Sequence, residues 1–156
     1  MRILFVCTGN TCRSPMAEVY FKSLCEKSGR TDITVESAGT FGGEGEPASS
    51  QSVSVMKNYG IDLSMHRSST LTKKKIDTAD LIIAMTSSHR HHVGSISSSA
   101  LKKTRTLLEF AQKQGNISDP FGGTEKIYSD CFSEMKEALD NLFLEIIRKK
   151  DYRNVQ

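Results

Sequence analysis

RILFVCTGNTCRSP, at residues 2–15, joins a short apolar run to a turn that contains two cysteines and an arginine. The run is rich in branched apolar residues, which predicts a buried strand. Gly9 and Asn10 adopt left-handed backbone angles more readily than other residues, so they favour a tight turn after it. Ser14 is a typical helix cap and Pro15 a typical first helical residue. The stretch therefore predicts a strand, a turn and a helix in direct succession.

The rest of the chain continues this alternation. Three further apolar runs are short enough to be strands, and they lie at 32–37, 79–85 and 104–110. The segment 49–59 and the apolar stripe over 132–146 are predicted as helices. Alternating strands and helices predict an α/β fold with a parallel sheet covered on both faces, in which ligands bind beyond the carboxyl ends of the strands. The length fits a single domain, 1–156.

Composition and charge exclude several classes of partner. The chain is 37% hydrophobic and 25% charged with a net charge of +3, and its lysines are spread out, so we expect no nucleic-acid partner. The lysines at 73–75 are expected on a solvated helix face. No apolar stretch is long enough to cross a membrane and the N-terminal run is too short for a secretion signal, so we expect a cytoplasmic protein with no membrane partner. The four cysteines form no C-x-x-C pair, which favours free thiols and no zinc.

The turn after the first strand has the composition of a phosphate site. A loop curled at Gly9 and Asn10 would point several N–H groups inward, at the positive end of the following helix. That field and the nearby Arg13 would lower the pKa of the Cys7 thiol and make it a nucleophile. The guanidinium of Arg13 would hold two phosphoryl oxygens, while Ser14 would donate a hydrogen bond to the sulfur. The alternative is that Cys7 is simply a small buried residue after a strand.

A cysteine that attacks phosphorus also needs a proton donor for the leaving group and a base for water. The candidate for both roles is Asp119 in SDPFGG, at 118–123. Pro120 stiffens the turn beside it, and Phe121 would form a wall next to the substrate. Taken alone, an Asp-Pro pair is a common turn signal.

With both segments in view, the chain resembles the low-molecular-weight protein tyrosine phosphatase family over nearly its full length. The matching segments are CTGNTCRSP at 7–15, ESAG at 36–39, His66 before a Ser/Thr-rich stretch, ADLIIAM at 79–85 and DPFGG at 119–123. The resemblance implies a four-stranded parallel sheet and hydrolysis of phosphorylated protein side chains through a phosphocysteine, with inorganic phosphate as product. It implies no metal and no cofactor. We expect the chain to act as a monomer.

The same resemblance implies roles for individual residues. Cys7 would be the nucleophile, Arg13 the phosphate clamp, and Asp119 first the general acid and then the base. The phosphate-binding loop would also contain Thr8, Gly9, Asn10, Thr11, Cys12 and Ser14. A supporting hydrogen-bond network would consist of Asn10, Ser14, Ser37 and His66. Phe41 and Phe121 would flank the substrate.

Two positions bear on which phosphorylated residue is the substrate. Family members that act on phosphotyrosine commonly have an aliphatic residue at the position of Thr11 and one or two tyrosines after the Asp-Pro pair. This chain has Thr11 and Phe121-Gly122-Gly123, and in both respects it is similar to the bacterial branch of protein arginine phosphatases. A branched hydroxyl at the rim of the loop would narrow the pocket and offer a polar contact to the attacking water or the leaving nitrogen. Phosphoarginine is therefore favoured, and phosphotyrosine is the alternative.

Other enzyme classes fit the sequence less well. The small arsenate reductases need a further cysteine pair in the later half of the chain, where this sequence has Cys131 alone. A phosphocysteine carrier should lack the pair Arg13 and Asp119, because together they promote attack by water.

The remaining cysteines and histidines have open or structural interpretations. Cys12 could approach Cys7 closely enough for a reversible disulfide, or it could serve the structure alone. Cys25 and Cys131 are expected to pack in the core. The histidines at 89, 91 and 92 lack partners at ligand spacing, so we expect a solvated helix face there and no metal site.

Overall fold

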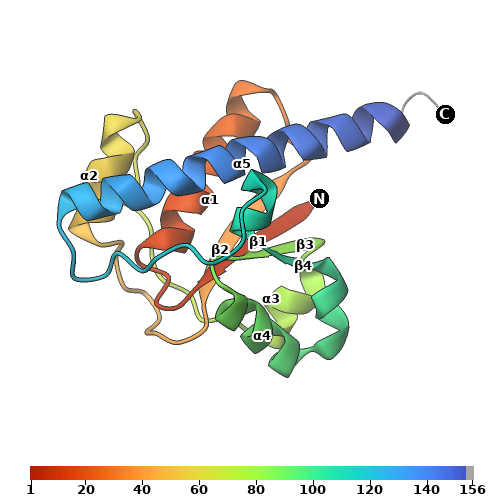
Figure 1. Cartoon of the computed structure of the whole chain (residues 1–156), viewed down its shortest axis with the longest axis horizontal. Coiled ribbons are helices and arrows are strands. Elements are labelled where there is room, and N and C mark those ends of the chain that lie inside the picture. The colour runs from red at the N-terminus through yellow and green to blue at the C-terminus, as the bar shows by residue number, and fades with distance from the viewer. Residues whose placement is uncertain (154–156) are drawn as a thin grey trace.

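The computed structural model describes residues 1–153, and its strands form one sheet in which every neighbouring pair is parallel. The strands are β1 (Arg2–Cys7), β2 (Thr34–Gly39), β3 (Leu81–Ala84) and β4 (Thr104–Thr106), in the order β2-β1-β3-β4 (Figure 1). The predicted four-stranded parallel α/β fold is confirmed. Residues 154–156 of the predicted single domain lie outside the described residues.

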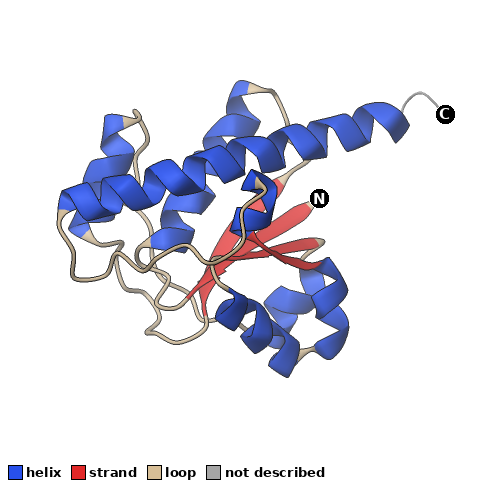
Figure 2. Ribbon diagram, viewed as in Figure 1, coloured by secondary structure: helices blue, strands red, loops and turns tan. Residues whose placement is uncertain are grey.

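Helices cover both faces of this sheet (Figure 2). They are α1 (Arg13–Lys27), α2 (Ser50–Asn58), α3 (Lys73–Thr78), α4 (Ser87–Ile96) and α5 (Glu125–Arg153), with two short 3₁₀ helices, η1 (Ser98–Lys103) and η2 (Leu107–Ala111). Lys73 and Lys74 at the start of α3 are exposed, as predicted, whereas Lys75 is half-buried and donates to the carbonyl of Thr70 at 3.2 Å. None of the helices in the described part of the chain is long and apolar enough to span a membrane.

The alternation of side chains along β1 divides the core between the two faces. Ile3 and Phe5 pack in the larger apolar cluster, which also contains the buried sides of α1, α2 and α5. Leu4 and Val6 point the other way, into a smaller cluster with Ile76 of α3 and Val93 of α4. Figure 1 shows this division, with α1, α2 and α5 on one side of the sheet and α3 and α4 on the other. Because β1 is buried on both faces, it reads as a continuous apolar run.

The strand order fixes where a ligand binds. The chain moves from β1 to β2 in one direction along the sheet and then returns to place β3 and β4 on the opposite side of β1. The connections diverge at this point, and in sheets of this kind ligands bind beyond the carboxyl ends of the strands there. The turn at residues 7–13 therefore lies where parallel sheets of this kind bind ligands.

The predicted fourth strand, 104–110, is wrong beyond Thr106. The chain turns there into η2, because Thr106 and Glu109 form a reciprocal capping box. The Thr106 side chain accepts from the backbone of Glu109, and the Glu109 carboxylate accepts the Thr106 N–H at 2.7 Å. The apolar residues Leu107, Leu108 and Phe110 remain buried in the 3₁₀ helix, so burial alone did not distinguish it from a strand.

The predicted start of the first helix is also wrong by two residues. Helix α1 begins at Arg13 with Cys12 in the capping position, and no side chain caps it. Ser14 cannot serve as the cap because its hydroxyl is turned inward, toward the sulfur of Cys7 and the amide of Asn10. Pro15 still lies within the first turn, where its missing N–H has no intrahelical partner to lose.

Candidate active site

Close backbone contacts hold the loop between β1 and α1. Asn10 has a φ of 56°, the left-handed angle predicted for this turn, whereas Gly9 does not need one. Gly39, at the end of β2, lies directly against the loop: a Cβ there would be 2.5 Å from the carbonyl oxygen of Thr8. The N–H of Phe41 donates to that same carbonyl at 2.9 Å. The end of β2 therefore forms a fixed wall for the loop.

The sulfur of Cys7 lies inside this loop and is almost fully buried. Burial raises the pKa of the thiol, and four smaller influences lower it: the Ser14 hydroxyl, the backbone N–H groups of Ser14 and Asn10, and the Arg13 guanidinium. The distance from Sγ to Ser14 Oγ is 2.9 Å. The groups predicted to stabilise a thiolate are thus in place. Burial of the sulfur opposes these groups and raises the pKa of the thiol.

Asn10 is the centre of a buried hydrogen-bond network. Its side-chain amide donates to Ser14 Oγ at 2.8 Å and to Ser37 Oγ at 2.9 Å, and its Oδ1 accepts the N–H of Ser69 at 2.8 Å. His66 Nε2 lies 2.7 Å from the carbonyl oxygen of Asn10. The four residues expected to form a supporting network therefore do lie together. These hydrogen bonds join Asn10 to α1, to β2 and to the segment 66–69, and together they hold its backbone in the left-handed conformation.

Glu18 extends this network and was not predicted from the sequence. Its carboxylate accepts a hydrogen bond from the Ser37 hydroxyl, which in turn accepts from Asn10. Glu18 also pairs with Lys22 one helical turn later. Since Glu18 lies on α1 among residues with an ordinary helical spacing, its sequence context resembles that of any surface glutamate.

Arg13 and Asp119 meet at the mouth of the loop. Arg13 is buried, and its Nη1 donates to the carbonyl of Ile117 at 2.9 Å, while Nη2 lies 3.5 Å from Thr8 Oγ1 and 3.6 Å from Asp119 Oδ2. The Asp119 side chain is 54% exposed, and its Oδ1 accepts the N–H of Phe121 at 3.1 Å. The predicted acid therefore lies beside the predicted phosphate clamp, with access to solvent.

Two phenylalanines with exposed rings are joined to this arrangement through their backbones. Phe41 is 82% exposed and Phe121 is 78% exposed. Each ring belongs to a residue whose backbone is tied to the site, Phe41 to Thr8 and Phe121 to Asp119. Both rings are therefore accessible to another molecule.

Thr11 and Cys12 occupy the outer part of the loop. Thr11 is half-buried, and its carbonyl accepts the N–H of Ser49 at 2.9 Å. The sulfur of Cys12 lies 3.1 Å from the hydroxyl of Tyr128, a contact between residues 116 positions apart in the chain. Among the described residues all four cysteines are unpaired and buried, and Cys25 and Cys131 pack in the larger core cluster as predicted.

His89 departs from its prediction. His91 and His92 are exposed, as expected for a solvated face, but His89 is buried against the phosphate loop. Its Nε2 lies 2.8 Å from Thr8 Oγ1. The contact joins residues 81 positions apart, so no local sequence pattern could reveal it. His89 lies near the N-terminus of α4, and the fold brings this end of the helix to the phosphate loop.

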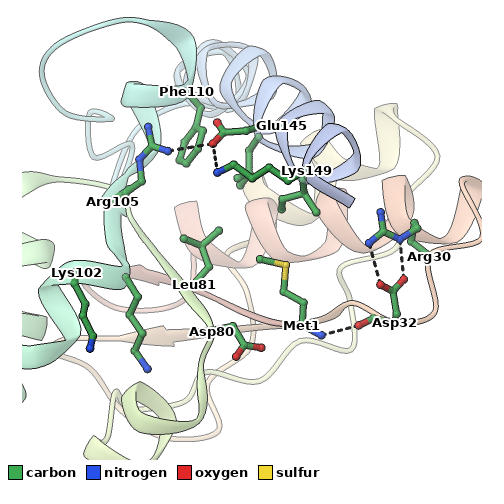
Figure 3. Close-up of a pocket in the computed structure, with 13 residues that line it drawn as sticks. Met1, Arg30, Asp32, Asp80, Leu81, Lys102, Arg105, Phe110, Glu145 and Lys149 are labelled. Carbon is green, nitrogen blue, oxygen red and sulfur yellow. Dashed lines mark hydrogen bonds and ion pairs between the residues drawn. The ribbon is translucent and has the colours of Figure 1, made fainter. Parts of the chain in front are cut away.

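A second hollow lies at the opposite end of the sheet, and it contains none of the predicted site residues. It has a volume of about 840 Å³ and is lined by residues near the amino ends of the strands, among them Met1, Asp80 and Leu81. Figure 3 shows ion pairs across its rim, between Arg105 and Glu145 and between Arg30 and Asp32. In parallel sheets, ligands bind beyond the carboxyl ends of the strands, and Cys7, Arg13 and Asp119 lie together at that end. We therefore place the active site there and not in this hollow.

Several known proteins are similar to this chain in sequence and in fold. The "Protein-arginine-phosphatase" of Bacillus subtilis is 41% identical over 154 residues, which cover 98% of this chain and 100% of the relative. The "Low molecular weight protein-tyrosine-phosphatase PtpB" of Staphylococcus epidermidis is 32% identical, with 91% of this chain and 96% of the relative covered. A solved structure described as "YwlE arginine phosphatase - C7S mutant with phosphorylated active site serine" has a TM-score of 0.90 at 40% identity, with 98% of this chain and 99% of that chain covered.

The geometry and these relatives together define the class of the protein, a cysteine-dependent protein phosphatase. Within that class, the model of the family "Low molecular weight phosphotyrosine protein phosphatase" matches residues 2–153, and the chain belongs to this family. The expected family is thereby confirmed.

Proposed function

We propose that this phosphatase hydrolyses phosphoarginine in proteins, with Cys7 as nucleophile, Arg13 as phosphate clamp and Asp119 as general acid and base. The observation that carries the choice of substrate is Thr11 at the outer part of the loop. The most similar relative described above, at 41% identity, is named a protein-arginine-phosphatase, whereas a relative named a tyrosine phosphatase is 32% identical.

In the first step the Cys7 thiolate attacks phosphorus. A bond forms between Sγ and phosphorus while the bond from phosphorus to the guanidino nitrogen breaks, and the protonated Asp119 gives its proton to that leaving nitrogen. The buried guanidinium of Arg13 holds two of the phosphoryl oxygens and offsets the charge on them. Its position is supported by the Ile117 carbonyl and the Thr8 hydroxyl.

In the second step water attacks the phosphocysteine. Asp119, now a carboxylate, takes a proton from the water as a bond from oxygen to phosphorus forms. The bond between phosphorus and Sγ breaks, so that inorganic phosphate leaves and the thiolate of Cys7 returns. The Ser14 hydroxyl at 2.9 Å stabilises the departing sulfur. The 54% exposure of the Asp119 side chain supports this role, because the carboxylate can reach both a substrate and a water from solvent.

The supporting roles are proposals of the same kind. The network around Asn10 keeps the loop in its left-handed conformation, and Ser14, Ser37 and His66 act through it. Phe41 and Phe121 flank the substrate's side chain, a role that their exposure and anchored backbones support. The choice between phosphoarginine and phosphotyrosine then depends on the shape and polarity at Thr11.

The test compares kcat/KM on phosphoarginine and phosphotyrosine peptides of the same sequence. We expect the wild-type protein to prefer phosphoarginine, and Thr11→Ile to shift the preference toward phosphotyrosine. Thr11→Val is the matched control, since it keeps the branched shape and removes the hydroxyl, and so separates polarity from size. A wild-type preference for phosphotyrosine, or an unchanged preference in Thr11→Ile, would contradict the proposed substrate.

We further propose that residues 1–156 act as one domain, as a monomer in the cytoplasm. The four free cysteines of the described part of the chain support a reducing compartment. One sheet with apolar clusters on both faces supports a single folding unit. Sedimentation at micromolar concentration tests the oligomeric state, and a dimer would refute it.

A further inference from the structure

A buried histidine connects α4 to the phosphate loop. His89 is 5% exposed, and each of its ring nitrogens has a hydroxyl partner: Nε2 lies 2.8 Å from Thr8 Oγ1 and Nδ1 lies 3.0 Å from Thr86 Oγ1. Thr86 is the N-cap of α4 and also accepts the backbone N–H of His89 at 3.1 Å. Because both nitrogens are engaged, the ring is held in one orientation, directed at the residue after the nucleophile.

The same hydroxyl of Thr8 lies next to the phosphate clamp. Arg13 Nη2 is 3.5 Å from Thr8 Oγ1, and its other near neighbour is Asp119, whose side chain is more than half exposed. The carboxylate must exchange between partners during the reaction proposed above. Thr8 is therefore the neighbour of Nη2 that can stay fixed throughout, provided that something fixes Thr8.

Burial and the neighbouring charge of Arg13 favour a neutral imidazole. Burial, and next the Arg13 guanidinium, lower the pKa of His89 to about 4; His92 acts in the same direction, and Asp119 opposes them. A neutral ring can hold Thr8 without placing a second positive charge beside Arg13. It can also keep this role across the whole range in which the enzyme would work.

We propose that His89 is a positioning residue for the phosphate clamp: its imidazole fixes the Thr8 hydroxyl, which in turn fixes Nη2 of Arg13. The inference rests on the proposed roles of Cys7 and Arg13. It does not depend on whether the substrate is phosphoarginine. Misplacing a catalytic group lowers the rate by far more than the free energy of the hydrogen bond that held it would suggest. A residue outside the pocket can therefore limit the rate.

The test measures kcat/KM on p-nitrophenyl phosphate and the inhibition constant of vanadate, which adopts the five-coordinate geometry of phosphoryl transfer. We expect His89→Leu to lower kcat/KM by about tenfold and to weaken vanadate inhibition by a similar factor. His89→Gln places an amide nitrogen near the position of Nε2, and we expect it to recover most of both. His91→Leu and His91→Gln are matched controls on the exposed face of the same helix. An aryl substrate is used so that failure of the phosphoarginine assignment leaves this result interpretable.

A double-mutant cycle with Thr8→Val tests the path through the hydroxyl. If His89 acts through Thr8, the double variant His89→Leu with Thr8→Val loses no more activity than the worse single variant. Thr8→Val alone tests the other end of the bond if the His89 variants do not fold. The proposal is overturned if the two losses multiply, if His89→Leu leaves kcat/KM and vanadate inhibition unchanged, or if His89→Gln is as impaired as His89→Leu while remaining folded.

Discussion

Buried His89 should make the fold sensitive to acid. The pKa of this histidine is lowered from 6.5 to about 4, first by burial and then by Arg13. In the unfolded chain the imidazole takes up a proton as the pH falls through about 6.5, whereas in the folded protein it does so near 4, so the unfolded state binds more protons between these values. Stability is therefore fully present above about pH 6.5 and is lost as the pH falls toward 4.

The size of this loss follows from the two pKa values. A difference of about 2.5 units is worth about 3 kcal/mol once both states are protonated, and about 2 kcal/mol of it is lost between about pH 8 and about pH 5. Carboxylates titrate in the same range, so the quantity that isolates His89 is the difference between wild type and His89→Gln. Removing the imidazole should flatten the dependence by about 2 kcal/mol, or about 4–8 °C in Tm for a domain of this size.

The assay is urea or thermal denaturation of wild type, His89→Gln and the exposed control His91→Gln at about pH 8 and about pH 5. His91→Gln is the matched control, because its side chain lies on the exposed face of the same helix. If the free energy of unfolding changes with pH by the same amount in His89→Gln and in wild type, the prediction is wrong. That result would mean that the buried ring accepts its proton at the same pH as in the unfolded chain.

Three further predictions concern the loop and its partners. Asp119→Asn should lower kcat/KM on phosphopeptides by about 10²-fold, with a smaller loss on p-nitrophenyl phosphate, whose leaving group needs no proton; an equal loss on both would remove the aspartate from the acid role. Ser14→Ala removes a hydrogen bond that lowers the pKa of Cys7, so the pH at which iodoacetamide alkylates this thiol at half its maximal rate should rise, and an unchanged midpoint would contradict the contact. Gly39→Ala places a methyl group 2.5 Å from the Thr8 carbonyl, so it should abolish vanadate binding and lower the Tm, whereas Gly43→Ala, whose nearest neighbour would be 3.5 Å away on a flexible glutamate, should do neither.

The parts of the fold that the sequence predicted are those set by local patterns. The central strand is a continuous apolar run, the turn after it contains an asparagine suited to a left-handed angle, and α2 begins and ends within one residue of the predicted 49–59. The fourth strand was overestimated because Leu107, Leu108 and Phe110 are apolar in either conformation. What ends the strand is a capping box at Thr106 and Glu109, a signal that the apolar count does not register.

The catalytic residues could be predicted from the sequence, whereas several residues around them could not. Cys7 and Arg13 share one loop, so their residue types and spacing suffice to associate them with phosphate chemistry. His89 meets Thr8, and Tyr128 meets Cys12, only through the packing of distant elements. The sequence reveals the groups that favour a thiolate at Cys7, whereas the opposing effect of burial on its pKa depends on the closed loop.

The proposed mechanism requires that phosphorus become bonded to Cys7 during turnover. Mixing Asp119→Ala with a phosphoarginine peptide, quenching in acid and mapping the digest by mass spectrometry tests this most directly, because the variant slows the attack of water on the intermediate. We expect the mass of one phosphoryl group on the peptide that contains Cys7, and none on the same peptide from Cys7→Ala. Turnover with no label on Cys7, or activity retained in Cys7→Ala, would contradict it.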